Sequence, residues 1–283
     1  MRAKLKAPYL LSALLTAVLV AQSALGLLFQ GVYRDVEWIK ATWFGNDWVT
    51  LVVAAPLLIA ALMLVRRGST RGLLLWLGLL GYSIYNDAFY LFGVALNAFF
   101  PFYIVALILA VAALILALAQ IDRTKVAAEF SPRTPARIVG GYLVCIAVMF
   151  FVVWLGMWAA HVFAGRPTPT KEPEAFKLVA ALDLTLMMPT LGLGGILLWR
   201  RQAWGYLIAT LAAIQGALYL LVLSVNSAVS IARGLEAAPG QLPIWGTLLV
   251  ATTAAAGLLL ASVRASEASA PESAPPALKR PAA

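Results

Sequence analysis

The sequence Tyr82-Ser83-Ile84-Tyr85-Asn86-Asp87-Ala88-Phe89-Tyr90 lies inside an apolar run, 72–96, that is long enough to cross a bilayer. A carboxylate at that depth is costly, so it needs a structural or functional reason. On a helix, polar side chains spaced by three, four and seven residues share one face: Ser83, Asn86, Asp87, Tyr90 and Asn97. The opposite face is apolar: Ile84, Ala88, Leu91 and Ala95. The stretch therefore predicts a membrane helix with a polar side and a lipid side.

The composition extends this prediction to the whole chain. Of its 283 residues, 63% are hydrophobic and 12% are charged, against roughly 25% charged in soluble domains. The apolar residues form blocks and do not alternate, which favours helices over barrel strands. The predicted fold class is all-α, a polytopic helical membrane protein with about eight transmembrane helices. The expected spans are 8–29, 49–65, 72–96, 102–120, 138–163, 176–199, 204–231 and 244–263. Together they form one integral membrane domain, 1–264, and the Ala/Pro-rich tail 265–283 is predicted to be disordered.

The orientation follows from the basic residues. Of the 21 Lys and Arg residues, 15 lie at the two ends of the chain and in every second connection between spans. The positive-inside rule then places both termini in the cytoplasm, with the protein in a bacterial inner (plasma) membrane. The first span could instead be a signal peptide cleaved near Ala24-Leu25-Gly26. Its apolar run exceeds the usual 7–15 residues of such a peptide, which favours a retained helix.

Two pairs of spans look alike. The first has Pro56, the pair Arg66-Arg67 and then Gly72, and the second has Pro189, the pair Arg200-Arg201 and then Gly205. The similarity is compatible with two four-helix halves of the same orientation, an arrangement found in some transporters. Convergence is the favoured interpretation, since basic pairs flank the cytoplasmic ends of spans in many membrane proteins.

Candidate site residues gather in the outer half of the predicted bundle. The rise of a helix places Asp87 and Asp183 at similar depths below the outer surface. The residues expected to line a polar cavity there, and to form a substrate or ion site, are Gln22, Asn86, Asp87, Tyr90, Asp183 and Asn226. Alternatively, Asp87 is a structural acid held by Asn and Tyr hydrogen bonds, and Asp183 reaches interfacial water or a basic residue.

Most kinds of catalytic or cofactor site are not expected. With one histidine, His161, and one cysteine, Cys145, the chain offers neither a dithiol nor the ligands of a zinc or haem centre. We expect no catalytic residue, no cofactor and no metal, because a GxSxG elbow and a P-loop are both absent. The formal charge of +9 lies mainly between spans, so it indicates topology and no nucleic-acid partner.

The segment 30–48 is rich in Trp, Tyr and acidic residues, which predicts a segment lying on the outer membrane surface. Three functional hypotheses follow from these observations. The leading one is a small-solute or ion transporter with a site around Asp87 and Asp183. The second is a membrane sensor or assembly protein that uses 30–48 as its contact, and the third is an intramembrane enzyme. The expected partners are the lipid bilayer and a small solute or ion, and the oligomeric state is not predicted.

Three strings resemble a group of bacterial polytopic membrane proteins that has no assigned activity. They are Asn46-Asp47-Trp48-Val49-Thr50, Arg66-Arg67-Gly68-Ser69 and the nine residues from Tyr85 to Gly93. The resemblance covers the second to fourth spans and, more loosely, the sixth and seventh. It implies a multi-spanning membrane fold and carries over no site residue.

Overall fold

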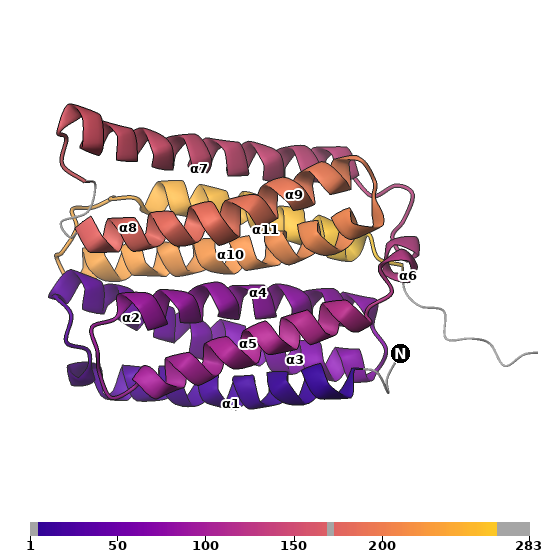
Figure 1. The fold of residues 1–283 in the computed structure, drawn as a ribbon, viewed down its shortest axis with the longest axis horizontal. Coiled ribbons are helices and arrows are strands. Elements are labelled where there is room, and N and C mark those ends of the chain that lie inside the picture. Colours follow the sequence, from indigo (N-terminus) through magenta and orange to yellow (C-terminus); the bar gives the residue numbers. More distant parts are fainter. Residues whose placement is uncertain (1–4, 169–172, 265–283) are drawn as a thin grey trace, which may run out of the picture.

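The computed structural model describes residues 5–168 and 173–264, and this part of the chain is helical apart from its connections. The predicted tail, 265–283, lies outside the described residues. Four helical spans form one layer: α1 (Lys6–Leu28), the continuous helix α2 (Glu37–Val49), η2 (Thr50–Ala54) and α3 (Ala55–Arg66), then α4 (Thr70–Gly93) and α5 (Phe100–Gln120). The second layer contains α7 (Ala136–Ala164), the continuous helix α8 (Pro173–Leu182), η3 (Asp183–Met187) and α9 (Met188–Trp199), then α10 (Ala203–Ala232) and α11 (Leu242–Ala261). Figure 1 shows the two layers, with α4 and α10 facing each other.

Short elements complete the connections. The 3₁₀ turn η1 (Gln30–Val32) follows α1, and the short helix α6 (Arg123–Ala128) joins the two layers. The side chain of Asp122 starts α6 by accepting hydrogen bonds from the backbone N–H groups of Thr124 and Lys125. The beginning of α1, α6 and the end of α11 lie at the same end of the bundle (Figure 1). This end carries the two Arg-Arg turns, and we call it the basic end.

The prediction of an all-α polytopic membrane protein is confirmed. Seven long helices in the described residues are apolar enough to span a bilayer. The eighth, α4, is less apolar because it lies at the centre of the bundle, where 17 of its 24 residues are buried. A helix surrounded by protein does not need an apolar surface for lipid. The predicted lipid side of this helix is therefore wrong: Ala88 is buried, and Ile84 is only partly exposed and packs against the core.

Two further predictions need correction. The segment 30–48 does not lie flat on the membrane surface, because from Glu37 it forms α2, which is continuous with the second span and buries Trp43 and Asp47. The second span therefore begins about 12 residues earlier than predicted, at 37 and not at 49. The third span ends at Gly93, so Asn97 lies beyond the helix, where its side chain accepts a hydrogen bond from the backbone N–H of Phe99.

The two layers are a structural repeat, and from the second span of each half to its third span the equivalent positions lie 133 residues apart. Both halves contain a five-residue π-helix, beginning at Thr50 in one and at Asp183 in the other. Each π-helix ends two residues before a proline, Pro56 or Pro189, whose ring nitrogen cannot donate to the carbonyl four residues earlier. A π-turn accommodates this break in the hydrogen-bond ladder without ending the helix.

The hairpin turns repeat in the same register. The backbone N–H of Ser69 donates to the carbonyl of Leu64, and that of Gln202 donates to the carbonyl of Leu197, both at 3.0 Å. After each turn a glycine lies against the preceding helix, so that a Cβ on Gly72 would overlap the Leu64 Cβ and a Cβ on Gly205 would overlap the backbone of Leu197. Each glycine therefore allows two consecutive helices to pack side by side.

Contacts between the layers are reciprocal. Gly78 faces Ile214, and the equivalent pair in the other direction, Gly81 and Leu211, is also in contact. The same holds farther along the bundle, where Gly45 faces Asn226 and Gly93 faces Leu178. Such exchanged pairs are expected when two halves are related by an approximate two-fold axis. The axis runs between α4 and α10, as in parallel-repeat membrane proteins.

Candidate functional site

A chain of buried polar side chains links the two halves in the part of the bundle remote from the basic end. The amide of Asn226 on α10 donates to Asn46 on α2 at 3.1 Å. Asn46 donates to Asn86 on α4, and Asn86 donates to Thr50, each at 3.4 Å. The Thr50 hydroxyl lies 3.0 Å from that of Tyr82. Gly45 makes this possible, because any side chain there would occupy the place of the Asn226 amide.

A second cluster surrounds Asp47, which is fully buried. Its carboxylate accepts one hydrogen bond from the Tyr33 hydroxyl at 2.7 Å and one from the Tyr90 hydroxyl at 2.8 Å. Gly26 on α1 leaves the room that the carboxylate occupies. Burial, followed by the negative charge of Asp47, raises the pKa of the Tyr33 hydroxyl above its usual range. Tyr33 thus keeps its proton and remains a donor.

Aromatic rings cover the Asp47 cluster toward the end of the bundle. Tyr90 stacks on Trp43 and on Tyr103, with ring centroids 5.1 Å apart in both pairs. The Trp43 indole N–H donates to Asp35, which also accepts from the backbone N–H of Ala95. These contacts tie the α1–α2 connection to the α4–α5 connection and seal this end of the first half.

A third cluster forms around Asp183, the first residue of the second π-helix. Its carboxylate accepts from the Tyr85 hydroxyl at 2.7 Å and from the Trp154 indole N–H at 2.9 Å. The ring of Tyr219 packs edge-on against Tyr85, with centroids 4.8 Å apart. Asp183 therefore draws its donors from α4 and α7, and it is not paired with a basic residue.

Asp87 differs from these two acids. It is fully buried, yet neither carboxylate oxygen has a hydrogen-bond partner in the described structure. The Gln22 side chain on α1 is also fully buried and lies close enough for its amide to interact with the Asp87 carboxyl group. The two side chains nevertheless form no hydrogen bond of ordinary distance and angle, either with each other or with another described residue. Next to Gln22, the buried Ser23 hydroxyl is likewise without a partner. Unsatisfied buried polar atoms are rare and call for an explanation.

No basic side chain compensates these acids. Asp47, Asp87 and Asp183 are buried, but no Lys or Arg in the described residues is. The three ion pairs found there each join residues three apart in the sequence, and none of them includes a buried residue. Tyrosine and tryptophan donors offset the charge of Asp47 and Asp183, and Asp87 lacks even these.

The predicted site residues are all buried, but they do not form one site. Asn86 and Asn226 belong to the amide chain, Tyr90 belongs to the Asp47 cluster, and Asp87 lies beside Gln22. Asp183 belongs to a separate cluster, on the side of α4 opposite to Asp87, because Tyr85 and Asp87 point in different directions around the helix. The two acids therefore lie in different polar groups, Asp183 with Tyr85 and Trp154 and Asp87 beside Gln22.

Asp47, Asn46 and Thr50 are not among the site residues that the sequence predicts. The aromatic residues around Asn46 and Asp47 are typical of the membrane interface, so this stretch is predicted to lie on the surface. A signal was present in their spacing. Trp43, Asn46, Asp47 and Thr50 repeat the three, four and seven-residue pattern of Ser83, Asn86, Asp87 and Tyr90. Two helices with the same polar face indicate a buried contact between them.

The fold and these clusters define a multi-pass helical membrane protein built from two repeated halves with a polar interior. No family model, curated protein or solved structure matches this chain.

Proposed function

We propose that this chain is a membrane transporter for a small solute or an ion, with its site between Asp87 on α4 and Gln22 on α1. The observation that supports the proposal is the set of four polar atoms, two from each side chain, that are buried without partners. Leaving one such group unsatisfied costs roughly 1–3 kcal/mol. The same bundle supplies two donors each to Asp47 and Asp183. Two buried polar side chains whose hydrogen-bonding capacity is unused support the proposal of a ligand site between them.

The chemistry of Asp87 and Gln22 indicates which kind of ligand they would bind. A carboxylate without a partner in an apolar interior is unfavourable, so Asp87 holds a proton while the site is sealed. When the site opens to water, Asp87 releases or exchanges that proton. The Gln22 amide offers a donor and an acceptor to a small polar solute. We therefore favour a proton-coupled mechanism in which Asp87 carries the proton.

The orientation is part of the proposal. The excess of Lys and Arg at the basic end supports a cytoplasmic location for both termini in a bacterial inner membrane. The Asp87 site then lies in the outer half of the bilayer. The amide chain from Asn226 to Asn46 crosses between the halves, so a movement of one half against the other would first break this hydrogen bond. Relative motion of repeated halves is how many transporters alternate access.

The test is whether water reaches the site. In a background with Cys145→Ala, a cysteine at Ser23 tests whether water reaches the buried face of α1 next to Gln22, and the substitution is mild because the Ser23 hydroxyl has no partner to lose. The full chain is placed in liposomes and treated with a membrane-impermeant thiol reagent from each side. Leu15→Cys, on the same buried face of α1, is the matched buried control, and Leu28→Cys, 73% exposed, is the accessible one.

For a transporter, the folded Ser23→Cys variant reacts from one side, more slowly than Leu28→Cys, while Leu15→Cys reacts only after denaturation. If Ser23→Cys is as protected as Leu15→Cys from both sides, the site never opens. That result would favour the alternative, a non-transporting sensor or assembly protein in which Asp87 is a sealed structural group.

A further inference from the structure

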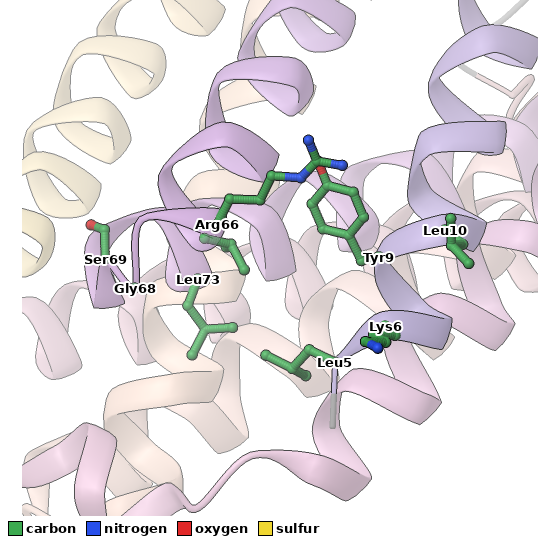
Figure 2. A pocket seen from close by; sticks show the side chains of 9 residues that line it. Leu5, Lys6, Tyr9, Leu10, Arg66, Gly68, Ser69 and Leu73 are labelled. Atoms are coloured by element: carbon green, nitrogen blue, oxygen red, sulfur yellow. The ribbon is translucent and has the colours of Figure 1, made fainter. Parts of the chain in front are cut away.

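A groove at the basic end of the first half is unrelated to the acid clusters. It has a volume of about 320 Å³ and lies between the start of α1 and the turn from α3 to α4. Figure 2 shows its lining, which includes Leu5, Tyr9, Arg66, Ser69 and Leu73. The groove is therefore placed where the apolar helices of the first half end, at the level of lipid headgroups.

The walls and rim of the groove differ in chemistry. The inner wall is apolar, with Leu5 and Leu73 both buried. The rim carries Lys6 and Arg66, both exposed and both without an ion-pair partner among the described residues. The Arg66 guanidinium lies over the Tyr9 ring, 4.6 Å from its centroid (Figure 2). This contact holds the charge at the mouth of the groove.

The second half provides an internal comparison, because the same place there is filled. The counterpart of Arg66 is Trp199, and that of the start of α1 is the start of α7. A Cβ on Gly140 would lie 2.7 Å from the carbonyl oxygen of Gly195, so α7 and α9 touch along their backbones. The Trp199 ring covers Gly141 at 3.0 Å from its Cβ position. The open groove and its arginine therefore occur together in the first half, and the second half has neither at the equivalent place.

We propose that this groove binds the headgroup and the upper acyl chain of an anionic glycerophospholipid. The phosphate would meet Arg66 and Lys6, which have no counter-charge within the part of the chain that the structure describes. The chain would follow the apolar wall and continue over exposed residues of α1, Leu10 and Leu14, which already face the bilayer. Basic pockets between helices at the membrane surface recognise anionic lipid headgroups in this way.

The test compares lipids that differ only in headgroup charge. The detergent-purified full chain is mixed with phosphatidylglycerol or with phosphatidylcholine of the same acyl chains, and bound lipid is counted by native mass spectrometry. The variants are Lys6→Gln and Arg66→Gln, with Arg67→Gln as the matched control, because Arg67 is an adjacent exposed arginine that does not line the groove. A fourth variant, Arg66→Trp, copies the closed second half.

We expect phosphatidylglycerol to be retained in preference to phosphatidylcholine. Each lost groove charge should weaken its binding roughly fivefold, the factor that corresponds to about 1 kcal/mol per basic residue at a membrane surface. Arg67→Gln should bind as the unmodified chain does, and Arg66→Trp should lose the preference while keeping the same melting temperature.

Three results would overturn the proposal. Equal retention of the two lipids would mean that the groove does not distinguish lipids by the charge of their headgroups. An equal loss in Arg67→Gln and Arg66→Gln would mean that the whole basic end attracts anionic lipid without a defined site. Displacement of phosphatidylglycerol by inorganic phosphate alone would identify a free-anion site in place of a lipid site.

Discussion

Replacing Asp87 by leucine should stabilise the protein slightly, whereas the same change at Asp47 should destabilise it. Asp87 forms no hydrogen bond of ordinary geometry, so its replacement breaks none. Removing a protonated carboxyl group that is buried without a partner gains roughly 1–3 kcal/mol. The larger leucine side chain costs about 1–2 kcal/mol through overpacking. The expected net gain in the free energy of unfolding is therefore small, about 0–1 kcal/mol.

At Asp47 the balance has the opposite sign. Its removal takes the carboxylate acceptor from the buried Tyr33 hydroxyl and leaves the Tyr90 hydroxyl only its longer contact with the Trp43 carbonyl, at 3.4 Å. Each unsatisfied hydroxyl costs roughly 1–3 kcal/mol, although hydrogen bonds within membrane proteins average nearer to about 0.6 kcal/mol in mutant cycles. We expect a loss of roughly 1–4 kcal/mol for Asp47→Leu.

The assay is equilibrium unfolding of each variant in mixed micelles, supported by melting temperatures in lipid nanodiscs. Asp87→Asn and Asp47→Asn serve as controls that keep the side-chain shape. If Asp87→Leu lowers the free energy of unfolding as much as Asp47→Leu does, then Asp87 is held by interactions that it does not make in this structure. The argument that its vacancy marks a ligand site would fail with that result.

Two further predictions concern packing and topology. Gly26→Ala should lower the free energy of unfolding by roughly 1–3 kcal/mol, because the added Cβ would overlap the Asp47 carboxylate. The control is Gly31→Ala, whose Cβ would meet nothing within 4 Å and which should leave the free energy of unfolding nearly unchanged. Equal effects of the two substitutions in a denaturation assay would contradict the packing around Gly26. In a Cys145→Ala background, Thr168→Cys should react with an impermeant maleimide outside intact cells and Lys125→Cys should not. The reverse labelling pattern would invert the proposed orientation.

The sequence predicted the spans well because a bilayer imposes a long apolar run on each helix, and such a run is easy to recognise. It predicted the second span poorly, because Asp47 and the aromatic residues near it look interfacial when their neighbours are unknown. Their burial depends on contacts with Tyr33, Tyr90 and Gly26, which come from three other parts of the chain. A long-range contact of this kind leaves little trace in local hydropathy.

The candidate site, too, could be predicted from the sequence only in part. Periodicity correctly indicated that Asp87 and Asn86 point into the bundle, and the repeat was visible in its prolines and arginines. The separation of Asp87 from Asp183 was not predictable, because depth alone does not say on which side of α4 each acid lies. The missing partners of Asp87 and Gln22 could not be predicted either, since satisfaction of a polar atom depends on distances between helices.

The most direct test of the central claim follows the Asp87 carboxyl group in infrared spectra of the membrane-reconstituted protein. Its protonated C=O band is assigned by its loss in Asp87→Asn and its retention in Asp47→Asn, and the buffer is then exchanged for D₂O. If the site opens, as proposed, the assigned band shifts to the position of the deuterated acid while the protein remains folded. A band that stays at its original position for as long as the protein is folded would mean that water never reaches Asp87, and this would contradict a transport site.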